Sequence, residues 1–533
     1  MAVENLITEH IDIWTSAVKT KSTSGRGSSN KLDLYGIKKL RELILELAVR
    51  GKLVPQDPND EPASVLLERI AAEKARLVKE KKITKPKKLA EVCDDEFSFE
   101  LPSNWDIRRL PDVYYTISPS GKKLKSSDVL EHGTYPVIDQ GQEAIAGYSN
   151  DEERVIDIES PIIIFGDHTR NIKYVDFSFV PGADGTKILC PIGIAPEFFY
   201  LQLRSYDIES RGYGRHFKIL NENLFVIPSL EEQHRIVAKV DELMTLCDQL
   251  EQQTEASIEA HQVLVTTLLD TLTNSADADE LMPNWARISE HFDTLFTTEE
   301  SIDQLKKTIL QLAVMGKLVP QDPSDEPAAE LLKRIAEDGD SPKKVRLTKP
   351  ISESEEPLTL PTGWVFTRLE SIIQISSGKN LTAKKMDSNG TIPVYGGNGV
   401  TGYHSENNVS EPTIVIGRVG FYCGSVHLTP KKAWVTDNAF VTKFSHSNLN
   451  LEFLFWLLKA TNLNENDSAT AQPVISGRKV YPIVVGLPPL NEQARIVAKL
   501  NELMAMCDFL KQSFSEHTST QLLLTNTIVE HAV

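Results

Sequence analysis

The sequence predicts an α/β (α+β) protein built as a pseudo-twofold tandem repeat, in which two α/β domains are joined by long antiparallel coiled-coil helices. Three observations carry this prediction. Two segments each occur twice in the 533 residues, two long heptad patterns lie at equivalent places, and two blocks rich in glycine and short β-like runs lie between them. Repetition at about half the chain length indicates a duplicated unit rather than a short-period solenoid.

The first duplicated segment is LAVRGKLVPQDPNDEP at 47–62, which returns as LAVMGKLVPQDPSDEP at 312–327, 265 residues later. The second is RIVAKVDELMTLCDQL at 235–250, which returns 260 residues later with eleven of sixteen positions identical. A chain of this length should hold several compact units. The predicted division is a helical region at 1–96, an α/β domain at 97–229, a central helical region at 230–356, a second α/β domain at 357–489 and a long helix at 490–533.

A short helix is predicted in each copy before the repeated PQDPxDEP. Apolar residues from Ile37 to Leu47 recur at helical spacing, and Gly51 stands where a helix would end in a left-handed residue; the copy runs from Ile302 to Gly316. The prolines then break the helix, and Pro62 or Pro327 suits the first turn of the next one. The plain alternative is a helical hairpin that packs only against itself.

The two heptad patterns predict helices of about 40 residues, each about 60 Å long at 1.5 Å per residue. The expected seam of the first consists of Ile236, Leu243, Leu250, Ser257, Leu264 and Thr271 beside Val240, Cys247, Thr254, His261 and Leu268, and that of the second of Ile496, Leu503, Leu510, His517 and Leu524 beside Leu500, Cys507, Phe514, Gln521 and Ile528. We expect the seam cysteines to be core residues, and the seam histidines to be neutral core or register-setting residues rather than metal ligands.

Composition and motifs exclude several classes of protein. Hydrophobic residues make up 41% and charged residues 25%, and no apolar run approaches the roughly 18 residues of a membrane span, so a cytoplasmic protein is expected. The five cysteines form no Cys-x-x-Cys pair, which supports neither a disulfide framework nor a zinc site. Phosphate-loop, dinucleotide-binding, zinc-protease and nucleophile-elbow motifs are also missing. The chain is predicted to be a binder with no catalytic residue, metal site or cofactor of its own.

The net charge of −18 is unevenly distributed. The block 101–228 has a balance of −5 and the block 360–488 one of +3, so the remaining −16 lies outside them, mostly on predicted helices. Acidic helices are poorly suited to lie along DNA. The basic Ser/Gly-rich stretch from Lys19 to Lys31 is predicted to be a linker, with phosphate binding as the alternative.

The glycine-rich loops of both blocks carry residues suited to reading an extended polar ligand, because glycine lets the backbone approach phosphate, Arg can pair with guanine, and Asn or Gln can pair with adenine. In the first block the candidates are Lys122, Lys123, Lys125, Gln140, Gln142, Tyr148, His168, Arg170, Lys173, Arg211, Arg215 and His216. In the second they are Lys379, Asn380, Lys384, Lys385, Tyr395, Asn398, Tyr403, Arg418, Tyr422, Arg478 and Lys479. Any one of them can equally be ordinary loop surface.

Taken together, the duplicated LAVRGKLVPQ and LAVMGKLVPQ, the openings LPSNW and LPTGW, IPVYGGNGVTGY and the closing LPPLNEQARIVAKL make the chain resemble the specificity subunit of type I restriction-modification systems. The first block departs from the pattern, with DQGQ at 139–142 in place of GGNG. The resemblance implies two target-recognition domains that each read one half of an asymmetric bipartite DNA sequence, with the helices holding them apart.

The same resemblance implies partners. Two modification subunits would carry S-adenosylmethionine and methylate adenine, and restriction subunits would use ATP and Mg²⁺ to translocate and cut DNA. Two other interpretations stay open from the residues alone: a coiled-coil scaffold that binds only proteins, and a nuclease or methyltransferase with unrecognised motifs.

Overall fold

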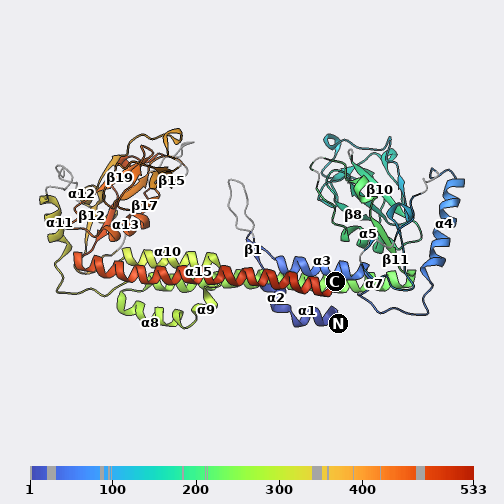
Figure 1. Ribbon diagram of the computed structural model, residues 1–533, viewed down its shortest axis with the longest axis horizontal. Helices are drawn as coiled ribbons and strands as arrows, with labels where there is room; N and C mark the ends of the chain where they lie inside the picture. Colours follow the sequence, from blue (N-terminus) through green and yellow to red (C-terminus); the bar gives the residue numbers. More distant parts are fainter. Residues whose placement is uncertain are drawn as a thin grey trace. The chain divides into compact units, whose positions relative to one another are not determined.

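The computed structural model describes residues 3–20, 32–84, 89–93, 96–97, 99–182, 185–210, 212, 214–338, 351–356, 359–387, 389–420, 422–463 and 474–533 (Figure 1). It divides into two compact units. Unit 1 comprises Met1–Ala256 with His517–Val533, and unit 2 comprises Ser257–Glu516. Most of the basic stretch, residues 21–31, lies outside the described residues, as does Arg211. Within the described part, no helix is both long and apolar enough to cross a bilayer.

Unit 1 contains one sheet domain, which runs from β3 to β11 and is called the first sheet domain. The helices that pack beside the long helices α7 (Leu230–Asn274) and α15 (Leu490–Ala532), together with these two, are called the scaffold helices. The elements of unit 1 are α1 (Val3–Glu9), α2 (Ile11–Ser16), β1 (Lys19–Thr20), β2 (Leu32–Asp33), α3 (Tyr35–Val49), α4 (Ala63–Lys79), β3 (Asp106–Arg109), β4 (Tyr114–Ile117), β5 (Tyr135–Ile138), β6 (Gly147–Ser149), β7 (Ile162–Gly166), β8 (Ile172–Val175), β9 (Val180–Pro181), β10 (Thr186–Pro191), α5 (Pro196–Ser205), α6 (Phe217–Leu220), β11 (Leu224–Ile227) and the start of α7 (Leu230–Asn274).

Unit 2 repeats this order, with a second sheet domain from β12 to β20. Its elements are the end of α7, α8 (Ala278–Ser289), α9 (Phe292–Leu295), α10 (Glu299–Val314), α11 (Ala328–Glu337), β12 (Val365–Arg368), α12 (Leu369–Ile372), β13 (Gln374–Ser377), β14 (Ile392–Gly396), β15 (Gly399–His404), β16 (Ile414–Gly417), β17 (Val426–Leu428), β18 (Trp434–Val435), β19 (Ala439–Lys443), α13 (Leu451–Ala460), α14 (Gly477–Val480), β20 (Val484–Leu487) and α15 (Leu490–Ala532), whose last residues belong to unit 1.

The two sheet domains have the same topology. Each has an antiparallel four-stranded sheet, in the order β4-β10-β7-β8 or β13-β19-β16-β17. Each has a three-stranded sheet with one parallel pair, β6-β5-β9 or β15-β14-β18. The first and last strands of each domain pair antiparallel, β3 with β11 and β12 with β20, so the chain enters and leaves through a two-stranded stem. The predicted duplication of the α/β domains is confirmed.

Both predicted short helices end as expected. Gly51 has φ +68° and Gly316 φ +72°, the left-handed region that favours glycine. In each copy the next lysine donates its backbone N–H back to the helix, Lys52 to the carbonyl of Leu47 and Lys317 to that of Leu312, both at 3.0 Å. This is the hydrogen bond that closes a Schellman motif and satisfies a carbonyl at the helix end.

The helix that follows each PQDP segment does not fold back on its predecessor. In unit 1, Lys74 of α4 donates to the carbonyl of Pro111 at 3.0 Å, and Gly193 leaves room for Ile70, which a β-carbon there would approach to 2.7 Å. In unit 2, Arg334 of α11 donates to Asn448 Oδ1 at 3.1 Å. The self-packing hairpin is therefore wrong, because α4 and α11 find their partners on the sheet domains.

The long helices run antiparallel to each other within each unit. In unit 1 the start of α7 is antiparallel to α3, and the end of α15 is parallel to α3. In unit 2 the end of α7 is parallel to α10, and the start of α15 is antiparallel to α10. The contacts that fix these directions are Arg41 with Asp248, Gln56 with Glu232, Tyr35 with Asn526 and Arg50 with Val533 in unit 1, and Gln262 with Glu300, Lys317 with Thr273, Lys306 with Asp508 and Lys511 with Asp303 in unit 2.

The predicted seam holds for the first half of each long helix only. In α7 the residues from Ile236 to Leu250 at seam positions are buried, but further on Leu264 is 50% exposed and Val265 is 1% exposed. In α15 Leu524 is 40% exposed and Thr525 fully buried. Val265 lies 29 residues after Ile236, close to eight turns of about 3.6 residues, whereas Leu264 falls about 80° short of the same face. A strict heptad was therefore wrong by one residue here.

The seam histidines also differ from expectation. His517 is exposed, and His261 is half-buried with its Nε2 3.2 Å from the carbonyl of Thr294. Cys247 and Cys507 are fully buried core residues, as predicted. The histidines therefore lie where the buried face has already turned away from the heptad rows.

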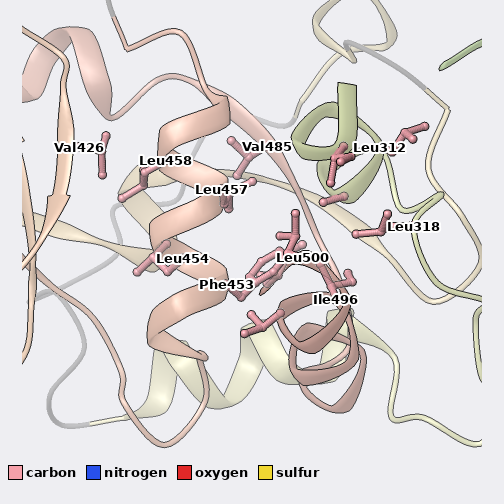
Figure 2. Close-up of a cluster of buried hydrophobic side chains, with 14 of the residues drawn as sticks. Leu312, Leu318, Val426, Phe453, Leu454, Leu457, Leu458, Val485, Ile496 and Leu500 are labelled. Atoms are coloured by element: carbon pink, nitrogen blue, oxygen red, sulfur yellow. The ribbon is translucent and has the colours of Figure 1, made fainter. Parts of the chain in front are cut away.

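The core of unit 2 is continuous from the scaffold helices into the sheet domain (Figure 2). Leu312 of α10 and Ile496 and Leu500 of α15 belong to one buried cluster with Phe453, Leu454, Leu457 and Leu458 of α13, Val485 of β20 and Val426 of β17. Because α13 lies between the scaffold helices and the sheet, the domain is attached by packing as well as by its stem.

A third duplicated segment escaped the sequence analysis. ITEHIDIWTS at 7–16 corresponds to ISEHFDTLFT at 288–297. His10 and His291 each precede a short helix with nearly the same backbone, φ −119° and ψ 22° against φ −120° and ψ 20°. The offset is 281 rather than 265 because the first copy carries extra residues that include β1 and β2. The repeat therefore extends almost to the N-terminus.

Candidate nucleic-acid interface

In the second sheet domain, several predicted contact residues converge on Asp437. Asn380 donates to Asp437 Oδ2 at 3.1 Å, and Arg418 Nη1 lies 3.4 Å from the Asp437 carbonyl. Lys379 directly precedes Asn380, and its carbonyl accepts a hydrogen bond from the indole of Trp434 at 3.2 Å. Loops that follow β13, β16 and β18 thus present an exposed lysine, an amide and a guanidinium together.

Arg418 is only partly satisfied by the protein. Its Nη1 bonds to Ser377 and Asp437 are both long, at 3.4 Å, and its guanidinium stacks 5.4 Å from the ring centroid of Phe440. Its Nε–H is buried and meets no acceptor among the described residues. Buried donors are nearly always paired in native proteins, so an unpaired one indicates a missing partner such as a ligand. A held guanidinium with spare donors suits bidentate recognition of a base or phosphate.

The first sheet domain has a loop cluster at the equivalent place, centred on Gln140. The Gln140 carbonyl accepts hydrogen bonds from Thr169 Oγ1 and, at 3.0 Å, from Asn171 Nδ2, and its side-chain Oε1 accepts from the backbone N–H of His168 at 3.2 Å. The loop after β5 is thereby tied to the turn between β7 and β8. The same turn holds Arg170, which is exposed and has φ +66°. A left-handed non-glycine residue costs about 1 to 2 kcal/mol, and such strain is concentrated at functional sites.

One position shows how the two domains differ on a shared backbone. Asp167 follows β7 and Arg418 follows β16; the first donates its N–H to the Gly185 carbonyl at 2.8 Å and the second to the Asn438 carbonyl at 2.9 Å. Asp167 stabilises the fold: its carboxylate accepts a hydrogen bond from the N–H of Phe217 at 2.8 Å, and the residue is only 4% exposed. The same place thus carries a satisfied acid in one domain and an incompletely satisfied base in the other.

The remaining predicted residues differ in accessibility. Exposed are Lys122, Lys125, Gln142, Arg170, Arg215, Lys379, Asn380, Lys384, Lys385, Asn398, Tyr403, Tyr422 and Arg478. Half-buried are Lys123, Gln140, Tyr148, His168, Arg418 and Lys479. The accessible set therefore includes members from the loops of both sheet domains.

Three predicted contact residues are buried instead. Lys173 donates to Asp139 at 3.3 Å, His216 Nδ1 lies 2.9 Å from the carbonyl of Asp167, and the hydroxyl of Tyr395 donates to the carbonyl of Leu428 at 3.2 Å. Because these groups are already paired inside the protein, we reassign all three to the folding of their domains.

The sequence prediction missed Asp437, which joins Asn380 to Arg418, and Trp434, which donates to the Lys379 carbonyl. Neither belongs to a glycine-rich motif, so the search for basic and amide residues in glycine loops passed over them. His404 was also missed; its ring lies edge-on to Trp434 with centroids 5.3 Å apart, and its buried Nδ1 meets no partner in the part of the chain that is described. An aromatic residue beside a loop lysine was the available signal.

The chain is similar to known proteins of one family. The family model for the type I restriction modification DNA specificity domain matches residues 102–260 and 361–516, which contain the two sheet domains and the first parts of the long helices. The chain is 40% identical to the type I restriction enzyme EcoAI specificity subunit and 37% identical to the EcoEI specificity subunit, both from Escherichia coli, with all of each chain covered.

Among solved structures, the HsdS subunit from Thermoanaerobacter tengcongensis matches 81% of this chain and 97% of its own, at 18% identity and a TM-score of 0.37. The family model covers more than half of the chain, and the two relatives cover it fully. The chain therefore belongs to the family of type I restriction-modification DNA specificity subunits.

Proposed function

We propose that each sheet domain reads one half of an asymmetric bipartite DNA target through the loop clusters around Gln140 and Arg418. The observation that carries this proposal is the exchange at one fold position, where Asp167 in the first domain is replaced by Arg418 in the second. Two binders with one backbone and unlike polar side chains are expected to read unlike sequences. The half-sites should differ, and the target should not be palindromic.

A patch of exposed apolar residues occurs twice on the long helices. Val263 and Leu264 of α7 are 62% and 50% exposed, and the equivalent Leu523 and Leu524 of α15 are 67% and 40% exposed. Apolar side chains in solvent commonly belong to interfaces when they occur together. A duplicated patch fits two copies of one partner, which we propose to be the two modification subunits; restriction subunits would join the same complex.

Catalysis and its cofactors are assigned to those partners. S-adenosylmethionine would be bound by the modification subunits, and ATP and Mg²⁺ by the restriction subunits, while this chain contributes recognition without a catalytic residue. A cytoplasmic location stays a prediction. The purified chain alone should neither cut nor methylate DNA in the presence of Mg²⁺ and S-adenosylmethionine, and activity in that experiment would favour an enzyme instead.

Co-expression of the chain with its modification subunits, followed by sequencing of methylated adenines, tests the proposal. The expected result is one bipartite motif with different halves, of which one half changes when residues 106–227 are replaced by the corresponding domain of another specificity subunit. If the assembled complex neither methylates DNA nor shifts its electrophoretic mobility, a scaffold that binds only proteins is favoured.

The long helices are proposed to set the gap between the half-sites. Both helices pass from one unit to the other, between Ala256 and Ser257 in α7 and between Glu516 and His517 in α15. Inserting four residues at both places lengthens each helix by about 6 Å, or one to two base pairs of about 3.4 Å. The half-sites should be unchanged and the gap longer. Insertion inside 264–272 would instead disturb the buried residues Val265, Leu269 and Leu272.

A further inference from the structure

A polar cluster around the buried carboxylate of Glu232 lies at the stem of the first sheet domain, and we call it the stem clamp. Glu232, in the first turn of α7, accepts hydrogen bonds from the indole N–H of Trp105 at 2.8 Å and from Gln56 Nε2 at 2.5 Å. One turn further, Arg235 donates two hydrogen bonds to the carboxylate of Asp60, at 2.6 and 3.2 Å. Gln56 and Asp60 come from the repeated PQDPxDEP segment, and Trp105 from the LPxxW opening.

The second unit repeats the stem clamp residue for residue. Glu492 accepts from the indole of Trp364 at 3.0 Å and from Gln321 at 3.2 Å, and Arg495 donates to Asp325 at 2.6 Å. All five residue types are the same in the two clamps. The repeated motifs of the sequence therefore meet in space, although the hydrogen-bonded tryptophan and glutamate are 127 and 128 residues apart.

A neighbouring glutamine extends the clamp to the interior of each sheet domain. Gln233 accepts a hydrogen bond from the backbone N–H of Ala195, just before α5, at 2.8 Å. Gln493 accepts in the same way from Asn450, just before α13, at 2.9 Å. Both glutamines also donate to a proline carbonyl at the domain exit, Pro228 or Pro488. The start of α7 is thus bonded to the LPxxW opening of its sheet domain, to the proline after its last strand and to the residue before α5. The start of α15 makes the same bonds, with α13 in place of α5.

Stability alone does not explain a carboxylate in this place. Glu232 is fully buried and Glu492 is 1% exposed, and this burial raises the pKa of both carboxyl groups against the lowering effect of their hydrogen bonds. Replacing buried polar pairs with apolar residues of similar volume is often neutral or stabilising. What directional bonds add is geometry, because apolar surfaces can slide where an indole N–H and a carboxylate cannot.

We infer that the stem clamps fix the orientation of each sheet domain on its long helix, so that Glu232 and Glu492 are positioning residues that determine which gap between half-sites is accepted. The inference rests on the proposed function, because a gap is defined only if each domain reads a half-site. The long helices would set the length of the gap. The stem clamps would hold each sheet domain in one orientation, so that only this one gap length is accepted.

The decisive variant replaces the polar pair by an apolar one. Glu232→Met alone leaves the buried Trp105 N–H without an acceptor and should destabilise unit 1. The double variant Glu232→Met/Trp105→Phe removes both polar groups, and Gln56 is exposed and can bond to water, so the fold should be retained. Glu231→Met is the matched control, since Glu231 is exposed at the neighbouring position.

The complex of each chain with its modification subunits is given duplexes that carry both half-sites, as determined with the unaltered chain, at the native gap and at one base pair less or more. The unaltered chain and Glu231→Met should methylate the altered gaps at least about tenfold more slowly, as for a mismatched base pair. The double variant should reduce this difference to about twofold, with the same half-sites and a melting temperature close to that of the unaltered chain.

Retention of the full preference for one gap by a folded double variant would overturn the inference. The equivalent Glu492→Met/Trp364→Phe variant gives an independent second measurement on the other unit. Failure of the proposed function is seen separately, because the unaltered complex would then methylate no bipartite sequence at any gap.

Discussion

The stem clamps are alike in the two units, whereas the loop clusters around Gln140 and Arg418 differ in their side chains. The clamps use the same five residue types in both units, with tryptophan-to-glutamate distances of 2.8 and 3.0 Å. The loops share the backbone and change the side chains. Asp167 becomes Arg418, and Gln140 corresponds to Gly397, since each lies two residues after the last parallel pair of its sheet, Ile138 with Pro181 or Tyr395 with Val435. Polar side chains are thus repeated at the stems, whereas only the backbone is repeated in the loop clusters, as the proposed reading of two different half-sites requires.

The loops also show how one backbone tolerates this change. The Gln140 carbonyl accepts hydrogen bonds from the β7–β8 turn, and the Gly397 carbonyl accepts one from Ser425 Oγ at 3.0 Å in the β16–β17 turn. A β-carbon at Gly397 would lie 2.5 Å from the Val419 carbonyl, so the second domain needs glycine where the first holds a glutamine. The bond between loops is kept by the main chain, which frees the side chains to differ.

The largest expected effect tests the shared side of this comparison. At Gly51 and Gly316 an alanine would have a positive φ, and its Cβ would lie 2.5 Å from Cγ of Pro102 or Pro361 at the domain opening. Gly51→Ala and Gly316→Ala should each cost about 2 to 4 kcal/mol of unfolding free energy, from backbone strain and steric overlap together. Calorimetry of the full chain measures this cost.

Gly121→Ala is the control for that experiment. Gly121 has φ +80°, and apart from its own chain neighbours no atom of the described residues lies within 4 Å of the place that an alanine β-carbon would take, so only the backbone strain of about 1 kcal/mol should be seen. Equal costs at Gly51 and Gly121 would show that the contact with the domain opening contributes nothing.

The next effect tests the differing side. Arg418→Ala should weaken binding to the half-site of the second domain by about 1 to 3 kcal/mol without lowering stability by a similar amount. Asp167→Ala should do the reverse, because it leaves the N–H of Phe217 without its acceptor and costs about 1 to 3 kcal/mol of stability. Binding titrations of the assembled complex and thermal unfolding separate the two. A weakened half-site for Asp167→Ala with unchanged stability would contradict the assignment.

The sequence was a good guide to features that depend on local pattern. Helical spacing and a terminal glycine predicted the helices that end at Gly51 and Gly316, and repeated motifs predicted two α/β domains. It was a poor guide where distant residues meet. Trp105, Glu232 and Gln56 were each visible in a duplicated motif, but their contact depends on how the chain returns through the stem after a whole domain.

Burial within the loops was equally out of reach of the sequence. Lys173 and Tyr395 resemble surface residues by type and by their glycine-rich surroundings, yet each has a partner inside its domain, Asp139 and Leu428. Which loop side chain faces inward is decided by strand register, and glycine content carries no information about register.

A smaller effect concerns acid stability of the clamps. Hydrogen bonds from Arg235 and Arg495 hold the pKa of Asp60 and Asp325 below the ordinary 3.8. Since the folded value is the lower one, the stabilisation is complete above the unfolded value and is lost as the pH falls through the folded value. Asp60→Asn should therefore cost about 1 kcal/mol at pH 7, and the difference from the unaltered chain should shrink below about pH 4.

Urea unfolding of both chains across this pH range provides the test. Both chains carry Glu232→Gln in this experiment, because the raised pKa of Glu232 gives the opposite dependence and Asp60 itself contributes to that shift. A difference that stays constant down to about pH 2 would mean that the Asp60 carboxylate is not ionised in the bond with Arg235.

The last comparison includes the variant with the smallest expected effect, Leu264→Ala, and decides the register of the long helices. Val265 is 1% exposed in the core of unit 2, so Val265→Ala should cost about 1 to 2 kcal/mol for its lost methyl groups. Leu264 is 50% exposed, and Leu264→Ala should change the unfolding free energy by less than about 0.5 kcal/mol. A strict heptad predicts the opposite order. Because Leu264→Ala leaves the fold intact, any loss of affinity for modification subunits in that variant, and equally in Leu524→Ala, would come from the exposed patch itself.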